Sequence, residues 1–237
     1  MLQSGLTSQQ PILSVESNSW WRHLLWIVGA AVLGYAVAAL FSDMAGLSRP
    51  LFLIPHALIS GGFVLAYLRW SKVELESTLR RQWLWGLVGA ALIGAFLVMN
   101  VLSQPASPRA TGPALIWDLL WLGVVYGTVD ALLLSVLPIL ATWQAFAVMG
   151  WTKGWLQMLV IGVVALVLSL VVTAAYHLGF AEFQGQAVVG PLIGNGASSL
   201  GYLLTGNPLG AIISHIAMHI ASVLHGPATT IQLPPHY

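Results

Sequence analysis

The sequence predicts an all-α integral membrane protein, a polytopic transmembrane helix bundle with about seven spans. Of its 237 residues, 58% are hydrophobic and only 6% are charged, and the mean hydropathy is +0.85. A soluble domain carries roughly 25% charged residues, because polar groups have to cover its surface. A surface that faces hydrocarbon has no such need, so membrane lipid is the first partner that the composition implies.

Seven runs of the sequence are long and apolar enough to cross a bilayer, which takes about 20 mostly apolar residues. Tryptophans, which favour the headgroup interface, lie near the ends of several runs and support the same boundaries. The expected spans cover residues 21–41, 51–70, 82–102, 115–142, 155–179, 187–204 and 208–225.

The sixth run is the weakest, because it contains helix-breaking and polar residues: Gly190, Pro191, Gly194, Asn195 and Gly196. We expect this segment either to span the membrane or to be broken or re-entrant. A non-helical backbone at membrane depth would have to be buried in protein or line a wet cavity.

The chain divides into two helical parts joined by a loop rich in proline. The polar N-terminal stretch has no Lys or Arg, unlike the start of a secretory signal peptide. The expected organisation is a polar tail over 1–19, a three-span part over 20–102, the loop over 103–113, a helical core with the polar site over 114–226, and a tail over 227–237.

The distribution of basic residues predicts the orientation. The loop between the second and third spans holds Arg69, Lys72, Arg80 and Arg81. Cytoplasmic loops are enriched in Lys and Arg, so we expect this loop and the N-terminus in the cytoplasm. The net charge is only +1 and no basic run occurs, so nucleic acid is not an expected partner. The absence of cysteine excludes disulfides and thiolate metal sites.

Ionisable side chains inside spans are costly and are therefore candidates for function. Asp130 lies well inside the fourth expected span, so it must be protonated, paired or facing water. Tyr126 lies one turn earlier on the same helical face, from which it could donate a hydrogen bond to Asp130. His177 lies at the end of the fifth span, where a histidine without further partners would be interfacial.

His215 and His219 are four residues apart, which places both imidazoles on one helical face, one turn apart. The opposite face of the same helix carries a stripe of small residues, which favours close helix packing: Gly210, Ser214, Ala217 and Ala221. Two interpretations stay open for the histidines. They are ligands or catalytic groups, or they are buried side chains bonded to backbone and hydroxyl groups.

One carboxylate together with two or three imidazoles suits zinc or another divalent first-row ion. Such an ion lowers the pKa of bound water and generates a nucleophile. Neither a His-Glu-x-x-His zinc motif nor a Gly-x-Ser-x-Gly serine hydrolase motif occurs. The metal and catalytic candidates are Asp130, His177, His215 and His219.

The order of these candidates resembles the CPBP family, which contains CAAX prenyl proteases and bacteriocin-processing proteins. The resemblance covers residues 115–226. The family has three motifs in the corresponding part: Glu-Glu-x-x-x-Arg, Phe-x-x-x-His and His-x-x-x-Asn. Val129-Asp130 stands at the glutamate pair, and Leu134 stands at the arginine. The second motif matches only at its histidine, His177. The third motif is matched by His215-Ile-Ala-Met-His219, with histidine in place of asparagine.

The resemblance implies an intramembrane metal-dependent peptidase that acts on a membrane-embedded peptide, with the four candidates as its site. Because one carboxylate replaces two, a relative that keeps the fold as a non-catalytic scaffold is the first alternative. A proton or metal transporter and a haem-binding bundle with histidine axial ligands are the others. Only one broken-helix candidate is visible, whereas transporters often carry such helices in two repeated halves.

Overall fold

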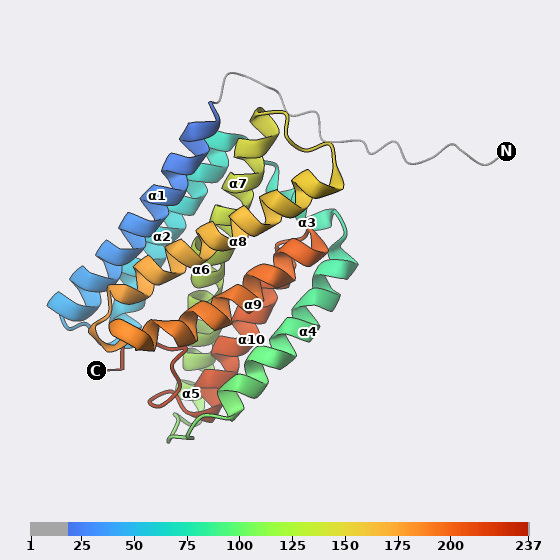
Figure 1. Ribbon diagram of the computed structural model, residues 1–237. Coiled ribbons are helices and arrows are strands. Elements are labelled where there is room, and N and C mark those ends of the chain that lie inside the picture. The colour runs from blue at the N-terminus through green and yellow to red at the C-terminus, as the bar shows by residue number, and fades with distance from the viewer. Residues whose placement is uncertain (1–18, 237) are drawn as a thin grey trace.

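The computed structural model describes residues 19–236, which form an all-helical bundle with no strand in that range (Figure 1). Six helical segments are long and apolar enough to cross a membrane: Trp20–Met44, Arg49–Ser71, Trp83–Leu102, Pro113–Val148, Trp155–Leu178 and Gly185–Thr205. A seventh apolar helix has 17 residues, near the lower limit for a span. The predicted multi-pass helical fold is therefore confirmed. Apart from Ser19, the predicted polar tail over 1–19 lies outside the described residues.

The N-terminal part contains three of the long segments. These are α1 (Trp20–Val37) with its π-helical extension η1 (Ala38–Met44), α2 (Arg49–Ser71) and α4 (Trp83–Leu102). The short helix α3 (Leu75–Arg80) lies in the basic loop between α2 and α4. An exposed ion pair joins Arg80 to Glu76 at 2.7 Å, one helical turn apart.

The fourth span is the centre of the bundle. It consists of α5 (Pro113–Asp118), η2 (Leu119–Val125), α6 (Tyr126–Asp130), η3 (Ala131–Val136) and α7 (Leu137–Val148). In its most apolar stretch 78% of the residues are buried, against 28–33% in the other long spans. It runs through the middle of Figure 1, and η2 and η3 are π-helical. It extends beyond the predicted 115–142 at both ends, and Pro138 lies inside this continuous helical segment.

The remaining helices complete the bundle: α8 (Trp155–Leu178), the short 3₁₀ turns η4 (Ala181–Phe183) and η5 (Gly185–Val188), α9 (Val189–Thr205) and α10 (Leu209–His225). The sixth segment is not broken, because α9 continues without interruption from Val189 to Thr205. Gly190 and Pro191 lie in its first turn, where proline removes no helical hydrogen bond.

Close contacts at small residues fix the position of α10. On one side, an added Cβ at Gly127 of α6 would lie 2.9 Å from the Cα of Ile216. On the other side, an added Cβ at Gly94 of α4 would meet Ser214 and Ala217 at 3.7 Å. Gly210 faces the backbone of α9 in the same way. The predicted small-residue face of α10 is therefore a packing surface, and the histidine face turns toward the central span.

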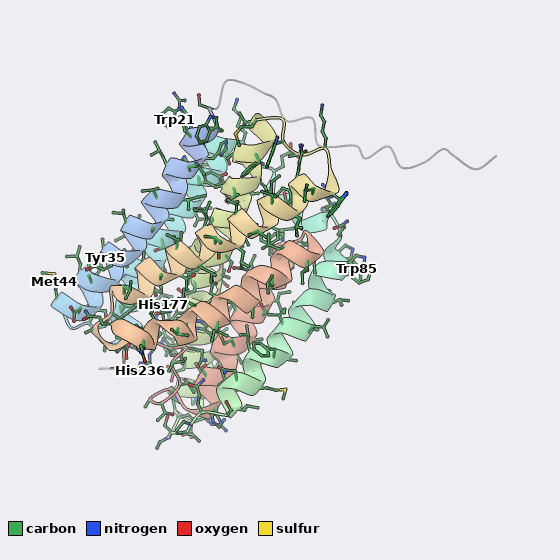
Figure 2. The ribbon with its side chains drawn as sticks, in the orientation of Figure 1. Trp21, Tyr35, Met44, Trp85, His177 and His236 are labelled. Atoms are coloured by element: carbon green, nitrogen blue, oxygen red, sulfur yellow. The ribbon has the colours of Figure 1, made fainter. Side chains whose placement is uncertain are left out.

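Large apolar side chains cover the outside of the bundle, as a surface in contact with lipid requires. Leu58 is 71% exposed and Leu92 is 68% exposed. Figure 2 shows Tyr35, Met44 and Trp85 on the outside as well. The predicted division at the 103–113 loop stays a prediction, but α2 and α4 of the first part pack directly on the helices of the second.

Candidate metal centre

A cavity lies between α4, α6, α8, α9 and α10, and the C-terminal segment also lines it through Ile231 and Gln232. It offers about 110 Å³ for the centres of water-sized molecules. A single water needs about 10–15 Å³ by this measure, so an ion with water ligands fits. All four residues predicted from the sequence line this cavity: Asp130, His177, His215 and His219. Three separate helical segments therefore bring the candidates together.

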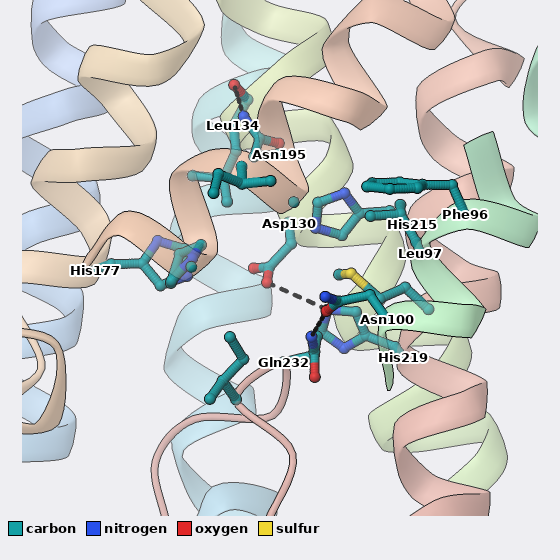
Figure 3. Close-up of a pocket in the computed structure, with 16 residues that line it drawn as sticks. Phe96, Leu97, Asn100, Asp130, Leu134, His177, Asn195, His215, His219 and Gln232 are labelled. Atoms are coloured by element: carbon teal, nitrogen blue, oxygen red, sulfur yellow. Dashed lines mark hydrogen bonds and ion pairs between the residues drawn. The ribbon is translucent and has the colours of Figure 1, made fainter. Parts of the chain in front are cut away.

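Three of these residues form a tight group. One ligand atom from each of Asp130, His215 and His219 lies within 4.8 Å of the others, and all three side chains are buried. Figure 3 shows these two histidines on one side of the Asp130 carboxylate and His177 on the other. His177 lies outside the tight group, so its role as a metal ligand stays a prediction.

The π-helical turn before Asp130 places His219. Directly after η2, the N–H of Tyr126 bonds to the carbonyls of Trp121 and Gly123 and not to that of Leu122, four residues back. That carbonyl instead faces the Nδ1 of His219 at 3.3 Å. Because a carbonyl can only accept, Nδ1 carries the proton, and the lone pair of the neutral ring is on Nε2.

The Nε2 of His219 lies 3.6 Å from the Oδ2 of Asp130, marked by a dashed line in Figure 3. Both atoms are acceptors when the ring is neutral, and this distance is longer than a hydrogen bond. Two ligands of a tetrahedral zinc ion, each about 2.0–2.1 Å from the metal, stand about 3.3 Å apart. The pair is therefore spaced for a shared cation.

His215 supplies a further sign of an incomplete site. Its Nδ1 is buried and has no hydrogen-bond partner. The large majority of buried polar side-chain atoms in proteins have a partner, because each unpaired one costs about 1–3 kcal/mol. The ring of His215 stacks on that of His219, with centroids 5.5 Å apart. The residues present therefore fit a divalent cation held by one carboxylate and two imidazoles.

His177 faces the cavity with a defined tautomer. Its Nδ1 lies 2.9 Å from the carbonyl oxygen of Thr173, so Nδ1 is the donor. The lone pair of the neutral ring is then on Nε2. An imidazole fixed in this way can accept a proton or bind a cation through Nε2.

His56 of α2 is a site residue that the sequence analysis missed. It is fully buried, and its Nε2 lies 2.9 Å from the Oδ1 of Asp130. The prediction places no site residue in the N-terminal part, although a histidine inside any membrane span is a functional candidate. The same rule, applied to the predicted span 51–70, identifies His56 as a candidate.

The predicted hydrogen bond from Tyr126 to Asp130 is wrong. The hydroxyl of Tyr126 donates to the carbonyl of Pro234 at 2.8 Å and is 3.0 Å from the hydroxyl of Tyr176. A phenol has one proton to donate, and Tyr126 donates it to the C-terminal segment instead of to Asp130. The C-terminal segment folds back into the bundle, where Leu233 is fully buried. The sequence gives no sign of this return.

Two other histidines, His225 and His236, which are not among the predicted candidates, lie outside the cavity. The Nε2 of His225 lies 2.8 Å from the carbonyl of Gln104. His236 bonds to the carboxylate of Glu182 at 2.7 Å and to the carbonyl of Thr230 at 2.7 Å. Neither residue lines the cavity, which agrees with their exclusion from the candidate set.

A second cluster of buried polar residues, the serine–asparagine network, supports the central span beside the cavity. It consists of Ser135, Ser169, Thr173, Asn195 and Ser199. Pro138 has no N–H, which leaves the carbonyl of Leu134, four residues earlier, without its helical donor. Ser169 and Asn195 donate to that carbonyl at 2.6 and 3.3 Å. The network thereby ties α8 and α9 to η3.

Comparison of the chain with family models, with curated proteins and with solved structures finds no match. The functional conclusion therefore depends on the chemistry of the cavity.

Proposed function

We propose that this membrane protein is an intramembrane metal-dependent hydrolase whose substrate is a membrane-embedded peptide. Asp130, His215 and His219 hold zinc or another divalent first-row ion. The observation that carries the proposal is the pair of acceptors, His219 Nε2 and Asp130 Oδ2, facing each other at 3.6 Å in a buried cavity. The unpartnered Nδ1 of His215 supports it.

A divalent ion at this position would lower the pKa of bound water and polarise a carbonyl group. His177 lies across the cavity with its Nε2 lone pair available, and we assign it the role of accepting or returning a proton. The cavity is enclosed by membrane-spanning helices, so the peptide bond to be cleaved has to lie within the bilayer. This placement matches the substrate class that the resemblance to the CPBP family implies.

The first experiment measures divalent metal in the purified protein by inductively coupled plasma mass spectrometry, after incubation with zinc. We expect close to one ion per chain in the parent and little in the His219→Ala variant. His225→Ala is the matched control, because it removes an imidazole from the same helix outside the cavity. The proposal is overturned if the parent holds no divalent ion, or if both variants retain the parental amount. A Soret band would instead favour a haem-binding bundle.

The second experiment separates hydrolysis from metal binding. A quenched fluorogenic transmembrane peptide in detergent micelles should be cleaved by the parent and left intact after treatment with a chelator. His177→Ala should keep the bound metal and lose at least about 100-fold in turnover, within the range expected for general acid–base catalysis. A protein that binds metal but cleaves none of a panel of such peptides would support the scaffold or transport alternatives.

We also propose that the N-terminus and the Arg69–Arg81 loop lie in the cytoplasm, because that loop is rich in basic residues. The chain has no cysteine, so single-cysteine variants label cleanly. Ser77→Cys and Ala106→Cys place exposed thiols in the loops before and after α4. An impermeant maleimide added to intact cells should label only Ala106→Cys, and the reverse pattern would invert the orientation.

A further inference from the structure

The two oxygens of the Asp130 carboxylate have different neighbours. Oδ2 faces His219 across the cavity at 3.6 Å, whereas Oδ1 lies 2.9 Å from the Nε2 of His56. His56 belongs to α2 and does not line the cavity. One oxygen is therefore held by a buried donor from behind, and the other is left for the cavity.

The hydrogen bonds of His56 are consistent with a single tautomer. A carboxylate oxygen can only accept, so Nε2 donates to Asp130. The Nδ1 of the neutral ring then accepts from the hydroxyl of Ser60, one turn along α2, at 3.2 Å. Both ring nitrogens are satisfied, and the imidazole has no free lone pair with which to bind an ion.

Aromatic neighbours fix the plane of the His56 ring. Phe52 stacks on it at an interplanar angle of 14° with centroids 5.5 Å apart. Tyr176 stacks on it at 22° and 5.1 Å. A ring held between two aromatic side chains loses little further freedom when it donates to the carboxylate.

The partner of His56 also sets it apart from the other histidines near the site. His177 and His219 use backbone carbonyls to fix their tautomers. His56 bonds only through side chains, and its partner is the one buried acidic residue in the described range 19–236. Groups behind a metal ligand commonly fix its orientation in this way.

We infer that His56 is the positioning residue for Asp130. It holds Oδ1, so that the carboxylate presents Oδ2 alone to the cavity and binds an ion through one oxygen. Ser60 supports this arrangement by keeping the proton of His56 on Nε2. The inference rests on the proposed function, because it assigns Asp130 the role of a metal ligand.

The test compares zinc affinity, measured by competition with a chelating dye, among the parent, His56→Leu and His56→Gln. Leucine keeps the bulk of the side chain and removes the donor, whereas glutamine retains an N–H that can reach the carboxylate. We expect His56→Leu to weaken zinc binding about 10–100-fold, as losses of such supporting groups do. His56→Gln should recover most of the affinity. A packing role alone would not make the two variants differ in this direction.

The outcomes separate the two proposals. If the parent binds no zinc, the proposed function fails and this inference fails with it. If the parent binds zinc and folded His56→Leu binds it equally well, only the positioning role is overturned. Equal losses in both variants would assign the effect to packing and also overturn that role. If His56→Leu does not fold, Ser60→Ala decides, because a folded variant with parental affinity contradicts the inference.

Discussion

The central span carries two buried polar clusters side by side, and they differ in whether their hydrogen bonds are complete. In the serine–asparagine network, the two N–H groups of Asn195 Nδ2 have three acceptors within hydrogen-bond distance, on Leu134, Ser169 and Thr173, and its Oδ1 accepts from Ser135. No atom of this network is buried without a partner. In the cavity, His215 has an unpaired Nδ1, and acceptors of Asp130 and His219 face each other.

This difference distinguishes a structural cluster from a binding site where burial alone does not. Asn195 is 3% exposed, as are Asp130 and His215. A complete network stabilises the fold because every buried group has a partner. An incomplete one leaves acceptors facing each other, and under the proposed function a divalent cation would pair with them. Mutations in the serine–asparagine network should therefore lower the free energy of unfolding and leave zinc affinity unchanged. Mutations of the cavity ligands should lower zinc affinity and change the free energy of unfolding little.

The largest expected effect is on metal binding. His215→Ala should weaken zinc binding more than about 100-fold, because losing a direct ligand should exceed the 10–100-fold cost of losing a supporting group. The metal-free protein should unfold at nearly the parental temperature, since the Nδ1 of His215 has no protein partner to lose. Dye competition measures the first quantity and thermal unfolding measures the second. A variant with parental zinc affinity and a much lower melting temperature would show that His215 stabilises the fold and is not a zinc ligand.

The next largest effect is expected for Gly127→Ala, which should lower both zinc affinity and the free energy of unfolding. In Gly127→Ala, the added methyl would lie 2.9 Å from the Cα of Ile216 and 3.2 Å from the carbonyl of His215. Helix α10 has to move away from α6, so both zinc affinity and the free energy of unfolding should fall, the latter by about 1–3 kcal/mol.

Gly162→Ala is the matched control for this substitution, because no atom lies within 4 Å of its added methyl. It should stabilise the helix by about 0.5–1 kcal/mol and leave zinc affinity unchanged. Equilibrium unfolding in mixed micelles measures both variants. Equal responses at the two glycines would contradict the close packing of α6 on α10.

Much of the fold could be predicted from the sequence, because hydrophobic runs report directly on membrane spans. The sixth segment was ambiguous because proline breaks a helix only in its interior, and a helix can also continue through glycines, as α9 does through Gly194 and Gly196. In the structure Pro191 lies in the first turn of α9. The π-helical turns η2 and η3 left no signal in hydropathy, yet the first of them contains the carbonyl of Leu122, which faces the Nδ1 of His219.

The site was predictable where one helix carries the information. His215 and His219 share a face by spacing alone, and Asp130 is conspicuous in an apolar span. The pairing of His56 with Asp130 was not predictable, because it joins residues 74 positions apart on different helices. The return of the C-terminal segment to Tyr126 was hidden for the same reason. Spacing identifies candidates, whereas contacts between helices decide which atoms stay unpaired.

The last expected effect concerns the serine–asparagine network. Ser169→Ala removes the shorter of the two hydrogen bonds to the Leu134 carbonyl and the 2.7 Å contact with Ser199. Asn195 still donates to that carbonyl, so the free energy of unfolding should fall by only about 1–2 kcal/mol, a range typical of polar contacts between membrane helices. Ser169 does not line the cavity, so zinc affinity should stay at the parental value. Mixed-micelle unfolding and dye competition measure the two quantities on one preparation. A large loss of zinc affinity in Ser169→Ala would contradict the separation of the two clusters. It would show that the serine–asparagine network, and not only the central span, holds the metal ligands in place.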